Sequence, residues 1–375
     1  MRQEVYRNTQ FLDLKKFVSR YNPQKVFLVV DKNSYEVSGA RLFIEKSFDV
    51  SMHVAFSDFN PNPQLSDLKK GISLFKDGKY ELILAIGGGS VIDMAKLISV
   101  MAHQDQDVKK IAKGSAILNN KKTPLLTIPT TAGTGAEATS FAVLYIDKVK
   151  YSVANESISP NYIFLSPEFL MSAPPYLTAC TGLDAFCQAI ESVWSINSTT
   201  ESEKYAFEAI DIVWNNLKMA VVDNDKKAKS LMQEAAYLAG KAINNTKTTA
   251  PHALSYAFTS YYNIPHGHAV ALSLPFFFEY NYGVSDIDCN DTQGGDIVRN
   301  RIDEILKIMN LNIENVNNKL TLFFDSIGIN INISTLIKDF NSDIIINNIN
   351  LERLNNNPRK INKTSLMSFL NNCKY

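Results

Sequence analysis

The sequence predicts an α/β domain with a mainly parallel sheet, followed by an all-helical domain. Three short apolar runs in the first half are typical of buried strands, at residues 26–30, 82–86 and 125–128. Helix-like stretches such as 66–76 and 91–101 lie between these runs. Because strands that alternate with helices form parallel sheets with helices on both faces, we expect a doubly wound sheet.

The pattern changes after about residue 160, where four prolines fall between residues 160 and 175 and strand-like runs become scarce. Beyond them, apolar residues recur at helical spacing in the segments 178–194, 201–218 and 226–245. A chain of 375 residues is also long for one domain. We therefore expect two domains, a nucleotide-binding domain over 1–170 and a helical domain over 171–375.

The C-terminal segment 301–375 contains seventeen asparagines, a bias that also occurs in disordered segments. Isoleucine, leucine and phenylalanine are interleaved with these asparagines and can bury an apolar face. We expect a folded segment whose surface composition is biased.

Charge and cysteine content exclude several classes of protein. The 38 basic residues balance 38 acidic residues and no basic block occurs, so we expect neither a nucleic-acid partner nor a membrane-surface partner. The chain has no apolar run long enough for a transmembrane helix and no apolar segment typical of a secretion signal at its N-terminus. Four cysteines without a CxxC pair favour reduced thiols and a cytoplasmic location.

A glycine-rich motif, GGGSVIDMAK, follows the second predicted strand. Glycines at a strand-to-helix turn let the backbone approach a phosphate, and the helix N-terminus offers N–H groups to a pyrophosphate. We expect Ser90 to cap this helix. A tight turn alone would also use glycines, but the added Ser, Asp and Lys favour cofactor binding. The cofactor-binding candidates in this motif are Gly87, Gly88, Gly89, Ser90, Asp93 and Lys96.

A second polar loop, PTTAGTGAE, follows the third predicted strand. Its hydroxyls at Thr130, Thr131 and Thr134 would lie at the carboxyl edge of the sheet, where open α/β sheets bind ligands. The alternative is a threonine-rich turn that caps a helix starting near Glu137. The pair of adjacent loops favours cofactor binding.

The helical half contains residues suited to a divalent metal. Asp184 and Gln188 are four apart and therefore share one helical face, and His252 and His266 follow in PHALSY and IPHGH. A carboxylate oxygen and two imidazoles that converge would form a metal site. For His53 and His103, in the first half, structural roles are preferred.

These motifs resemble those of the iron-containing (group III) alcohol dehydrogenases. The resemblance extends from Asn62 to Arg359 and includes GGGSVIDMAK, PTTAGTGAE, TGLDAFCQAIE, HALSY and PHGHA. It implies the dehydroquinate synthase-like architecture, with an active site in the cleft between the two domains. It also implies an alcohol dehydrogenase or aldehyde reductase that uses NAD(P)H and one divalent metal, in which the metal acts as a Lewis acid on the carbonyl.

The resemblance implies Asp184, His252 and His266 as metal ligands. Where the family has a fourth ligand, a histidine, this chain has Gln188, whose amide oxygen is a weaker donor than imidazole. Fe²⁺, Zn²⁺ and Mn²⁺ therefore stay open as the metal, and a degenerate site without metal is the alternative. A further family histidine is here Tyr256, so either Tyr256 or His268 would serve as the proton relay.

Gln188 in place of a histidine, the HALSY segment and the N-terminal segment that opens the chain resemble the phosphonoacetaldehyde reductase branch. This implies reduction of phosphonoacetaldehyde to 2-hydroxyethylphosphonate. A phosphonate needs a cationic partner, for which Lys247 is the candidate, with Lys241 nearby. Two lysines on a helix are also typical of a solvated face.

The acidic residue at the end of the first strand favours NAD(H) over NADP(H). Asp31 would accept from a ribose hydroxyl and repel a 2′-phosphate, although Lys32 beside it weakens that repulsion and the branch often lacks an acid here. Alternative functions are a dehydroquinate-synthase-like lyase that uses NAD transiently, a general short-chain alcohol dehydrogenase, and a non-catalytic nucleotide-binding scaffold. A small aldehyde or alcohol is the expected partner, and a homodimer is one candidate oligomeric state.

Overall fold

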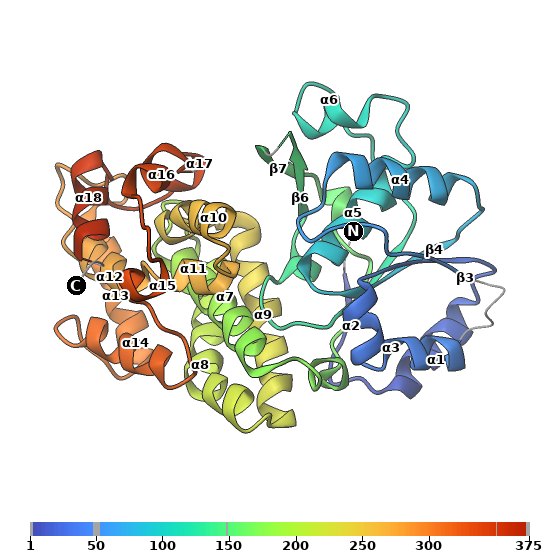
Figure 1. Cartoon of the computed structure of the whole chain (residues 1–375), viewed down its shortest axis with the longest axis horizontal. Helices are drawn as coiled ribbons and strands as arrows, with labels where there is room; N and C mark the ends of the chain where they lie inside the picture. The colour runs from blue at the N-terminus through green and yellow to red at the C-terminus, as the bar shows by residue number, and fades with distance from the viewer. Residues whose placement is uncertain (1–2, 48–52, 148, 350, 373–375) are drawn as a thin grey trace. The chain divides into compact units, whose positions relative to one another are not determined.

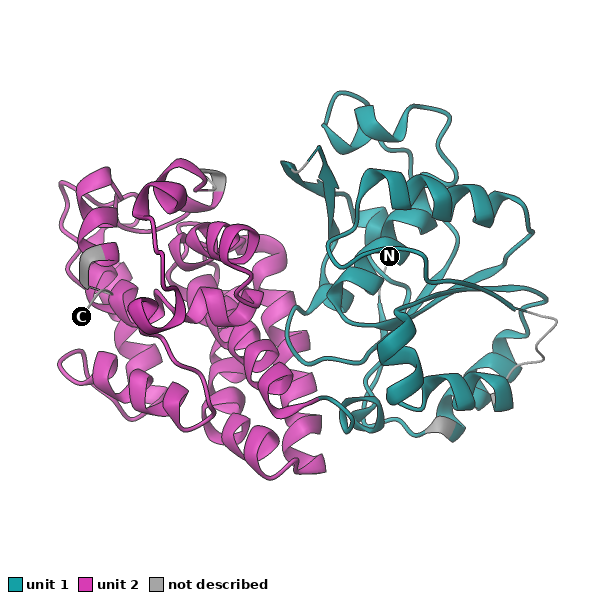
Figure 2. Cartoon of the chain, viewed as in Figure 1, with its two compact units in different colours: residues 1–173 teal, residues 174–375 magenta. Residues whose placement is uncertain are grey.

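The computed structural model describes residues 3–47, 53–147, 149–349 and 351–372 (Figure 1). The chain divides into two compact units, residues 1–173 and 174–375 (Figure 2). This boundary lies close to the expected one, after a short connection rich in proline.

Unit 1 is built on a six-stranded sheet in the order β1-β8-β5-β4-β2-β3, in which every adjacent pair is parallel. The strands are β1 (Glu4–Tyr6), β2 (Val26–Val30), β3 (His53–Phe56), β4 (Leu82–Gly87), β5 (Leu125–Pro129) and β8 (Tyr162–Phe164). The three central strands are the three apolar runs, because a strand covered on both faces is continuously apolar. The strands β1, β3 and β8 were not predicted, because each has only three or four residues; β1 and β3 are the edge strands, and β8 lies between β1 and β5.

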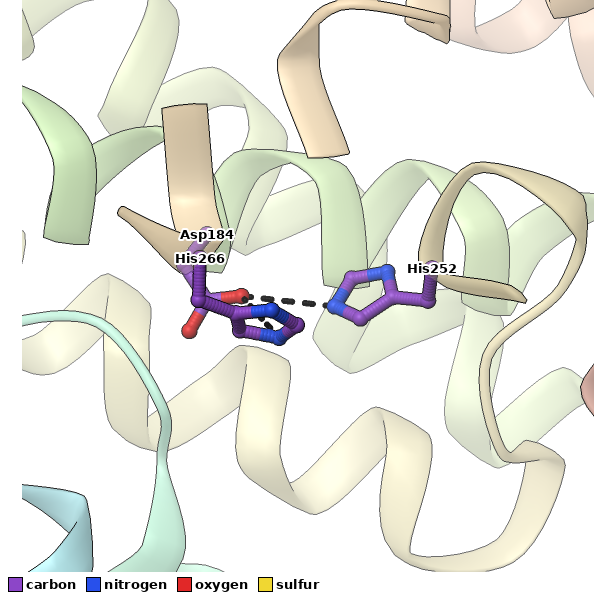
Figure 3. A group of neighbouring side chains, drawn as sticks. All are labelled: Asp184, His252 and His266. Atoms are coloured by element: carbon purple, nitrogen blue, oxygen red, sulfur yellow. Dashed lines mark hydrogen bonds and ion pairs between the residues drawn. The ribbon is translucent and has the colours of Figure 1, made fainter. Parts of the chain in front are cut away.

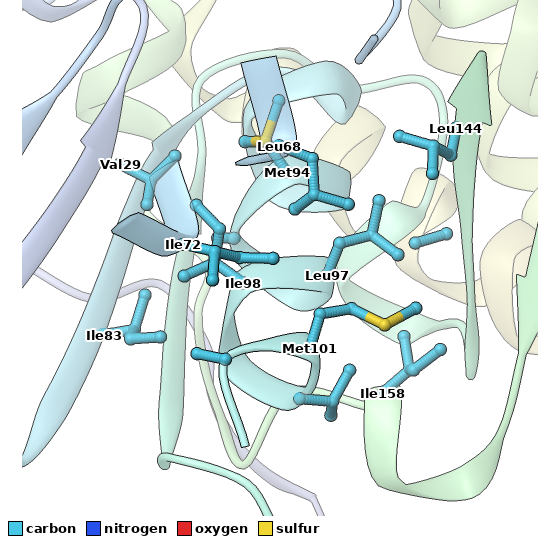
Figure 4. Close-up of a cluster of buried hydrophobic side chains, with 14 of the residues drawn as sticks. Val29, Leu68, Ile72, Ile83, Met94, Leu97, Ile98, Met101, Leu144 and Ile158 are labelled. Carbon is cyan, nitrogen blue, oxygen red and sulfur yellow. The ribbon is translucent and has the colours of Figure 1, made fainter. Parts of the chain in front are cut away.

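Both faces of the sheet are covered, as predicted. Alternate strand residues divide between two buried clusters: Val29 and Ile83 face one, while Leu28 and Leu84 face the other. Helices α4 (Leu65–Lys76) and α5 (Gly89–Met101) cover the first face, with Leu68, Ile72, Met94 and Leu97 in its core (Figure 4). Helices α1 (Phe11–Tyr21) and α3 (Ala40–Ser47) supply Phe17 and Ile44 to the second cluster.

An antiparallel hairpin outside the main sheet was not predicted. It consists of β6 (Phe141–Ile146) and β7 (Val149–Ala154), and its alternate residues Ala142 and Leu144 join the α5 side of the core. The remaining unit 1 helices are α2 (Lys32–Val37), α6 (Val108–Ala112) and the 3₁₀ turns 136–138, 156–158 and 167–170.

The named elements of unit 2, within its described residues, are all helices, as predicted. The first four are α7 (Pro175–Trp194), α8 (Thr200–Val222), α9 (Lys226–Thr246) and α10 (Ala250–Tyr262). The next four are α11 (His266–Ala271), α12 (Leu274–Tyr282), α13 (Gly295–Ile308) and α14 (Val316–Asp325). The last four are α15 (Ile333–Leu336), α16 (Ser342–Asn347), α17 (Leu351–Leu354) and α18 (Lys363–Asn372).

The asparagine-rich C-terminal segment is folded where the structure describes it. Ile305, Phe324 and Phe369 are buried, which supplies the apolar face that the composition allowed. Several asparagines cap short helices: the side chain of Asn332 accepts from Ser334 N, and that of Asn341 accepts from Asp343 N. Asparagine is frequent here because helix starts use its side-chain oxygen.

Two further expectations bear on the whole chain. Cys180, Cys187 and Cys289 are free thiols, and Cys373 lies outside the described residues. None of the helices in the described ranges combines the length and apolar character that a membrane span requires.

Candidate metal and cofactor sites

The two predicted cofactor loops of unit 1 lie side by side. Strands β4 and β5 pair in parallel with Gly87 opposite Pro129, so the chain leaves both strands at the same edge of the sheet. Thr130 N donates to the Gly87 carbonyl oxygen at 3.0 Å. A Cβ on Gly89 would lie 2.8 Å from Thr134 Oγ1. The absence of a side chain at this glycine is therefore what allows the two loops to approach.

The first loop ends in the N-terminus of α5, but Ser90 does not cap it. Helix α5 begins at Gly89, and Gly88 is its N-cap residue with an extended backbone. Ser90 lies in the first turn, where its Oγ accepts from Asn62 N at 3.2 Å. The prediction of a Ser90 cap is wrong because glycine supplied the cap backbone. The N–H groups of the first helical turn still lie at this edge of the sheet.

One hydroxyl in the second loop has no hydrogen-bond partner among the described residues. Thr130 Oγ1 is buried and has no hydrogen-bond partner within the described part of the chain. An unpaired buried hydroxyl is uncommon in native proteins. A cofactor bound at this edge would provide the missing partner, so the loops fit the dinucleotide that the sequence implies.

Asp93 and Lys96 hold the second loop and the hairpin rather than lining the edge of the sheet. The Lys96 ammonium is fully buried and donates to Thr139 Oγ1 at 2.8 Å and to the Phe141 carbonyl oxygen at 2.7 Å. Asp93 Oδ2 accepts from Val143 N at 3.0 Å. Burial lowers the pKa of Lys96 to about 8. In this structure both side chains are engaged with the segment 139–143, and their direct contact with a cofactor stays a prediction.

The helix that the alternative interpretation placed near Glu137 is a single 3₁₀ turn, Ala136–Ala138. Burial raises the pKa of Glu137 to about 7, with partial compensation from its own backbone and from Lys96.

Asp31 follows β2 as predicted and also caps α2. Its carboxylate accepts from Ser34 N at 2.7 Å. Asp31 and Lys32 line a hollow that also contains Asp67 and Lys70. Lys70 is paired with Asp67 at 3.5 Å, so acidic and basic groups are mixed in this hollow.

In unit 2, three candidate metal ligands converge from three helices. Asp184 comes from α7, His252 from α10 and His266 from the first position of α11. Their ligand atoms lie within 4.8 Å of one another (Figure 3). Asp184 Oδ1 lies 3.3 Å from His252 Nε2 and 3.8 Å from His266 Nε2. The three residues therefore converge as the sequence predicted.

Gln188 lies one turn after Asp184 on α7, and its side chain is 5% exposed. Its Oε1 atom is buried and has no hydrogen-bond partner among the described residues. An amide oxygen is an acceptor, and a buried acceptor without a donor, one helical turn after Asp184, suits a cation. The residues present therefore fit the metal that the sequence implies, with Gln188 as fourth ligand.

The site carries substantial negative charge. Burial lowers the pKa of His252, but the carboxylates of Glu191 and Asp184 outweigh burial and raise it to about 10. A pocket that holds a proton so strongly on an imidazole also favours a metal cation, so a metal ion and a proton compete for His252.

Glu191 was not identified from the sequence. Its carboxylate, fully buried on α7, accepts from the His252 ring at Nδ1 and from Thr249. The signal was present, because Asp184, Gln188 and Glu191 are spaced i, i+4 and i+7 and so share one helix face.

Of the two proton-relay candidates, the structure places Tyr256 at the site. Its ring stacks on His266 with centroids 5.7 Å apart and planes 5° apart. His268 is engaged elsewhere: its Nε2 donates to the Asn330 carbonyl oxygen at 2.6 Å, and its Nδ1 accepts from Tyr176 at 2.9 Å. A histidine with both nitrogens committed is structural, so the relay role expected for His268 is not supported.

The other histidines lie outside the cluster. His103 Nε2 is 2.8 Å from Thr123 Oγ1 in unit 1, and His53 is part of β3. Both fit the structural roles that were preferred for them.

The two lysines near the end of α9 differ in their setting. Lys241 lies over the Tyr205 ring at 5.7 Å. Lys247 has φ 60° and ψ −179°, a backbone conformation that residues with a Cβ rarely adopt, and its ammonium donates to the Asn244 carbonyl oxygen at 3.0 Å.

Comparison with protein families gives matches over most of the chain. Residues 3–167 match the family described as iron-containing alcohol dehydrogenase, and residues 178–373 match the C-terminal part of the Fe-containing alcohol dehydrogenase family.

Named relatives include the long-chain-alcohol dehydrogenase 1 of Geobacillus thermodenitrificans, 36% identical over 61% of this chain and 59% of the relative. The 1,3-propanediol dehydrogenase of Klebsiella pneumoniae is 31% identical over 69% of this chain and 68% of its own. The match to the Geobacillus relative thus spans less than two thirds of its length.

Two solved structures resemble the whole chain. The sulfoacetaldehyde reductase from Bifidobacterium kashiwanohense, solved with NAD⁺, has a TM-score of 0.86 and 25% identity over 100% of this chain and 99% of its own. An alcohol dehydrogenase from Oenococcus oeni has a TM-score of 0.84 and 26% identity over 99% and 98%. These likenesses confirm the predicted fold class.

Proposed function

The chain belongs to the iron-containing alcohol dehydrogenase family, and on this premise we propose that it is a metal-dependent aldehyde reductase that uses NADH. The observation that carries this proposal is the convergence of Asp184, His252 and His266, with Gln188 one helical turn after Asp184 and its buried Oε1 without a hydrogen-bond partner among the described residues. Two buried ligands, Asp184 and His252, together with a partly exposed His266, argue against a degenerate site and against a non-catalytic scaffold.

We assign the four cluster residues to one divalent metal, with Fe²⁺ as the first candidate and Zn²⁺ or Mn²⁺ as alternatives. When bound, the metal supplies Lewis-acid polarisation of the substrate carbonyl. The ring of Tyr256 covers one face of His266, and we propose its hydroxyl as the proton donor to the product alcohol. The hydride comes from NADH, for which the 87–90 and 130–134 loops are the proposed site.

For the substrate we propose an acetaldehyde that carries a strong acid group, with phosphonoacetaldehyde as the first candidate and 2-hydroxyethylphosphonate as its product. The sulfoacetaldehyde reductase likeness supports this size and charge, because a sulfonate and a phosphonate are both tetrahedral anions. The proposed anchor for the anion is Lys247.

The backbone of Lys247 supports that assignment. A φ of 60° with ψ near 180° costs a residue with a Cβ about 1–3 kcal/mol relative to glycine. Strained residues cluster at ligand sites, and Lys247 lies five residues before His252, which is consistent with an ammonium that binds the substrate anion. In this structure the ammonium and the backbone N–H of Lys247 both donate to carbonyl oxygens at the end of α9, so a role in ending this helix is the alternative.

An NADH-oxidation assay on the purified full chain tests the proposal. Phosphonoacetaldehyde, sulfoacetaldehyde and propanal are compared, each with Fe²⁺, Zn²⁺ or Mn²⁺ added separately. We expect metal-dependent NADH consumption that is fastest with the anionic aldehydes. Equal rates with propanal would leave a general short-chain alcohol dehydrogenase, and no net NADH consumption with any aldehyde would favour the dehydroquinate-synthase-like lyase.

The cytoplasmic location and a homodimeric assembly are proposals that rest on the sequence alone. Size-exclusion chromatography with light scattering tests the assembly.

A further inference from the structure

We propose that Glu191 is a positioning residue for the metal site. It fixes the ring of His252 so that Nε2 is directed at the metal, and it joins this ring to the start of α10. The inference rests on the proposed metal site, which does not itself include Glu191.

The contact with His252 determines which ring nitrogen is available. The side chain of Glu191 is 0% exposed, and its Oε1 accepts the hydrogen bond from His252 Nδ1. A nitrogen that donates to a carboxylate carries its hydrogen, which leaves Nε2 as the lone-pair atom in the metal-bound form. Nε2 is the nitrogen that faces Asp184 at 3.3 Å.

The second carboxylate oxygen holds the chain just before His252. Glu191 Oε2 accepts from Thr249 N at 2.7 Å and from Thr249 Oγ1 at 2.9 Å, and the N–H of His252 lies 3.4 Å away. Trp194 Nε1 donates to the same Thr249 hydroxyl at 2.9 Å. Thr249 is the N-cap residue of α10 but makes no side-chain cap bond, so Glu191 takes the place of a capping side chain.

Only a carboxylate satisfies all these groups. Each atom that faces Glu191 is a donor, and an ionised carboxylate is an acceptor on both oxygens. A glutamine has the same shape but presents its NH₂ group either to the His252 ring or to Thr249. Replacing Glu191 by glutamine therefore places two hydrogen-bond donors against each other but leaves no cavity.

The test measures Co²⁺ binding to the metal-free full chain, by chelator competition and by the visible Co²⁺ spectrum. For Glu191→Gln we expect a folded protein whose Co²⁺ dissociation constant is about 10- to 100-fold higher, with an altered spectrum. Glu191→Asp keeps both acceptors at a shorter reach and should recover part of the lost affinity.

Asp291→Asn is the matched control. This buried carboxylate also lies in unit 2, but it accepts from Arg301 at 2.7 Å and from Gln293 N at 2.9 Å rather than from metal-site residues. We expect a lower melting temperature with the Co²⁺ affinity and spectrum of the wild type.

Wild-type Co²⁺ affinity and spectrum in Glu191→Gln would overturn the inference, as would an equal loss of affinity in Asp291→Asn. If Glu191→Gln does not fold, Glu191→Asp decides: weaker binding with an altered spectrum supports the inference and wild-type binding overturns it. Failure of the wild type to bind Co²⁺, Fe²⁺ or Zn²⁺ would instead overturn the proposed function, and the inference with it.

Discussion

A Cβ atom on Gly267 would lie 1.8 Å from the carbonyl oxygen of Cys180 and 3.0 Å from Asp184 N. The backbones of α11 and α7 therefore touch at a point where no side chain fits. His266 precedes this glycine and Asp184 follows Cys180 by one helical turn. The contact between the two helices is what brings two metal ligands from distant parts of the chain together.

Gly267→Ala should consequently weaken the metal site. The added methyl group forces α11 away from α7, which separates His266 from Asp184 and costs about 1–3 kcal/mol of stability through overpacking. We expect a lower melting temperature and at least tenfold weaker binding of Fe²⁺ or Zn²⁺ in a chelator-competition titration. Gly295→Ala is the matched control, since a Cβ there meets its nearest atom at an ordinary 3.4 Å. Equal metal affinity in both variants would contradict the packing argument.

His266→Ala should lose metal and turnover while the fold is retained. Its Nε2 is a ligand atom, but the side chain is 35% exposed, so truncation removes little buried area. Metal content of the purified variant, NADH oxidation and the melting temperature are the measurements. Turnover that survives in the variant, or in exhaustively chelated wild type, would exclude the proposed metal chemistry.

Gln188→Met separates the role of Gln188 in metal binding from its role in folding. Methionine keeps the length of the side chain and removes the unpartnered oxygen, whose burial costs about 1–3 kcal/mol in the metal-free protein. We expect the metal-free variant to melt a few degrees higher and to bind Fe²⁺ more weakly. Gln188→His, which restores the ligand that the family resemblance implies, should bind Fe²⁺ more tightly than the wild type. Unchanged affinity in both variants would remove Gln188 from the ligand set.

Lys247→Gly and Lys247→Ala form a pair that distinguishes strain from charge. Both remove the ammonium and should raise KM for phosphonoacetaldehyde about tenfold or more, with KM for propanal little changed. Only the glycine variant relieves the backbone, so it alone should gain about 1 kcal/mol in the free energy of unfolding. An equal loss on both substrates would show that Lys247 supports the fold near His252 rather than reading the anion.

Asp31→Ser tests the preference for NADH. Serine retains a side-chain acceptor for Ser34 N at the start of α2 and removes the negative charge. We expect the ratio of kcat/KM for NADH to that for NADPH to fall by roughly tenfold, because about 1 kcal/mol of repulsion with a 2′-phosphate is lost. An unchanged ratio would show that Asp31 is a helix cap without a role in cofactor choice.

The parts of the site that follow directly after buried strands were accessible from the sequence. The runs ending at Gly87 and Pro129 are apolar because both faces of the sheet are covered, and parallel pairing then places the next residues at one edge. The roles of Ser90 and Lys96 were not accessible, because the first depends on where the helix begins and the second on burial beside β6.

The division into a parallel α/β half and a helical half can be predicted from the sequence, as can the candidate ligands Asp184, His252 and His266. Periodicity and residue type are local properties, and ligand chemistry follows from residue type. Only the packing of the described residues shows that Gln188 Oε1 has no hydrogen-bond partner among them, that both ring nitrogens of His268 are bonded and that Glu191 holds His252. These relationships depend on residues that are distant in the sequence, and whether a buried polar atom is satisfied depends on neighbours that only packing supplies.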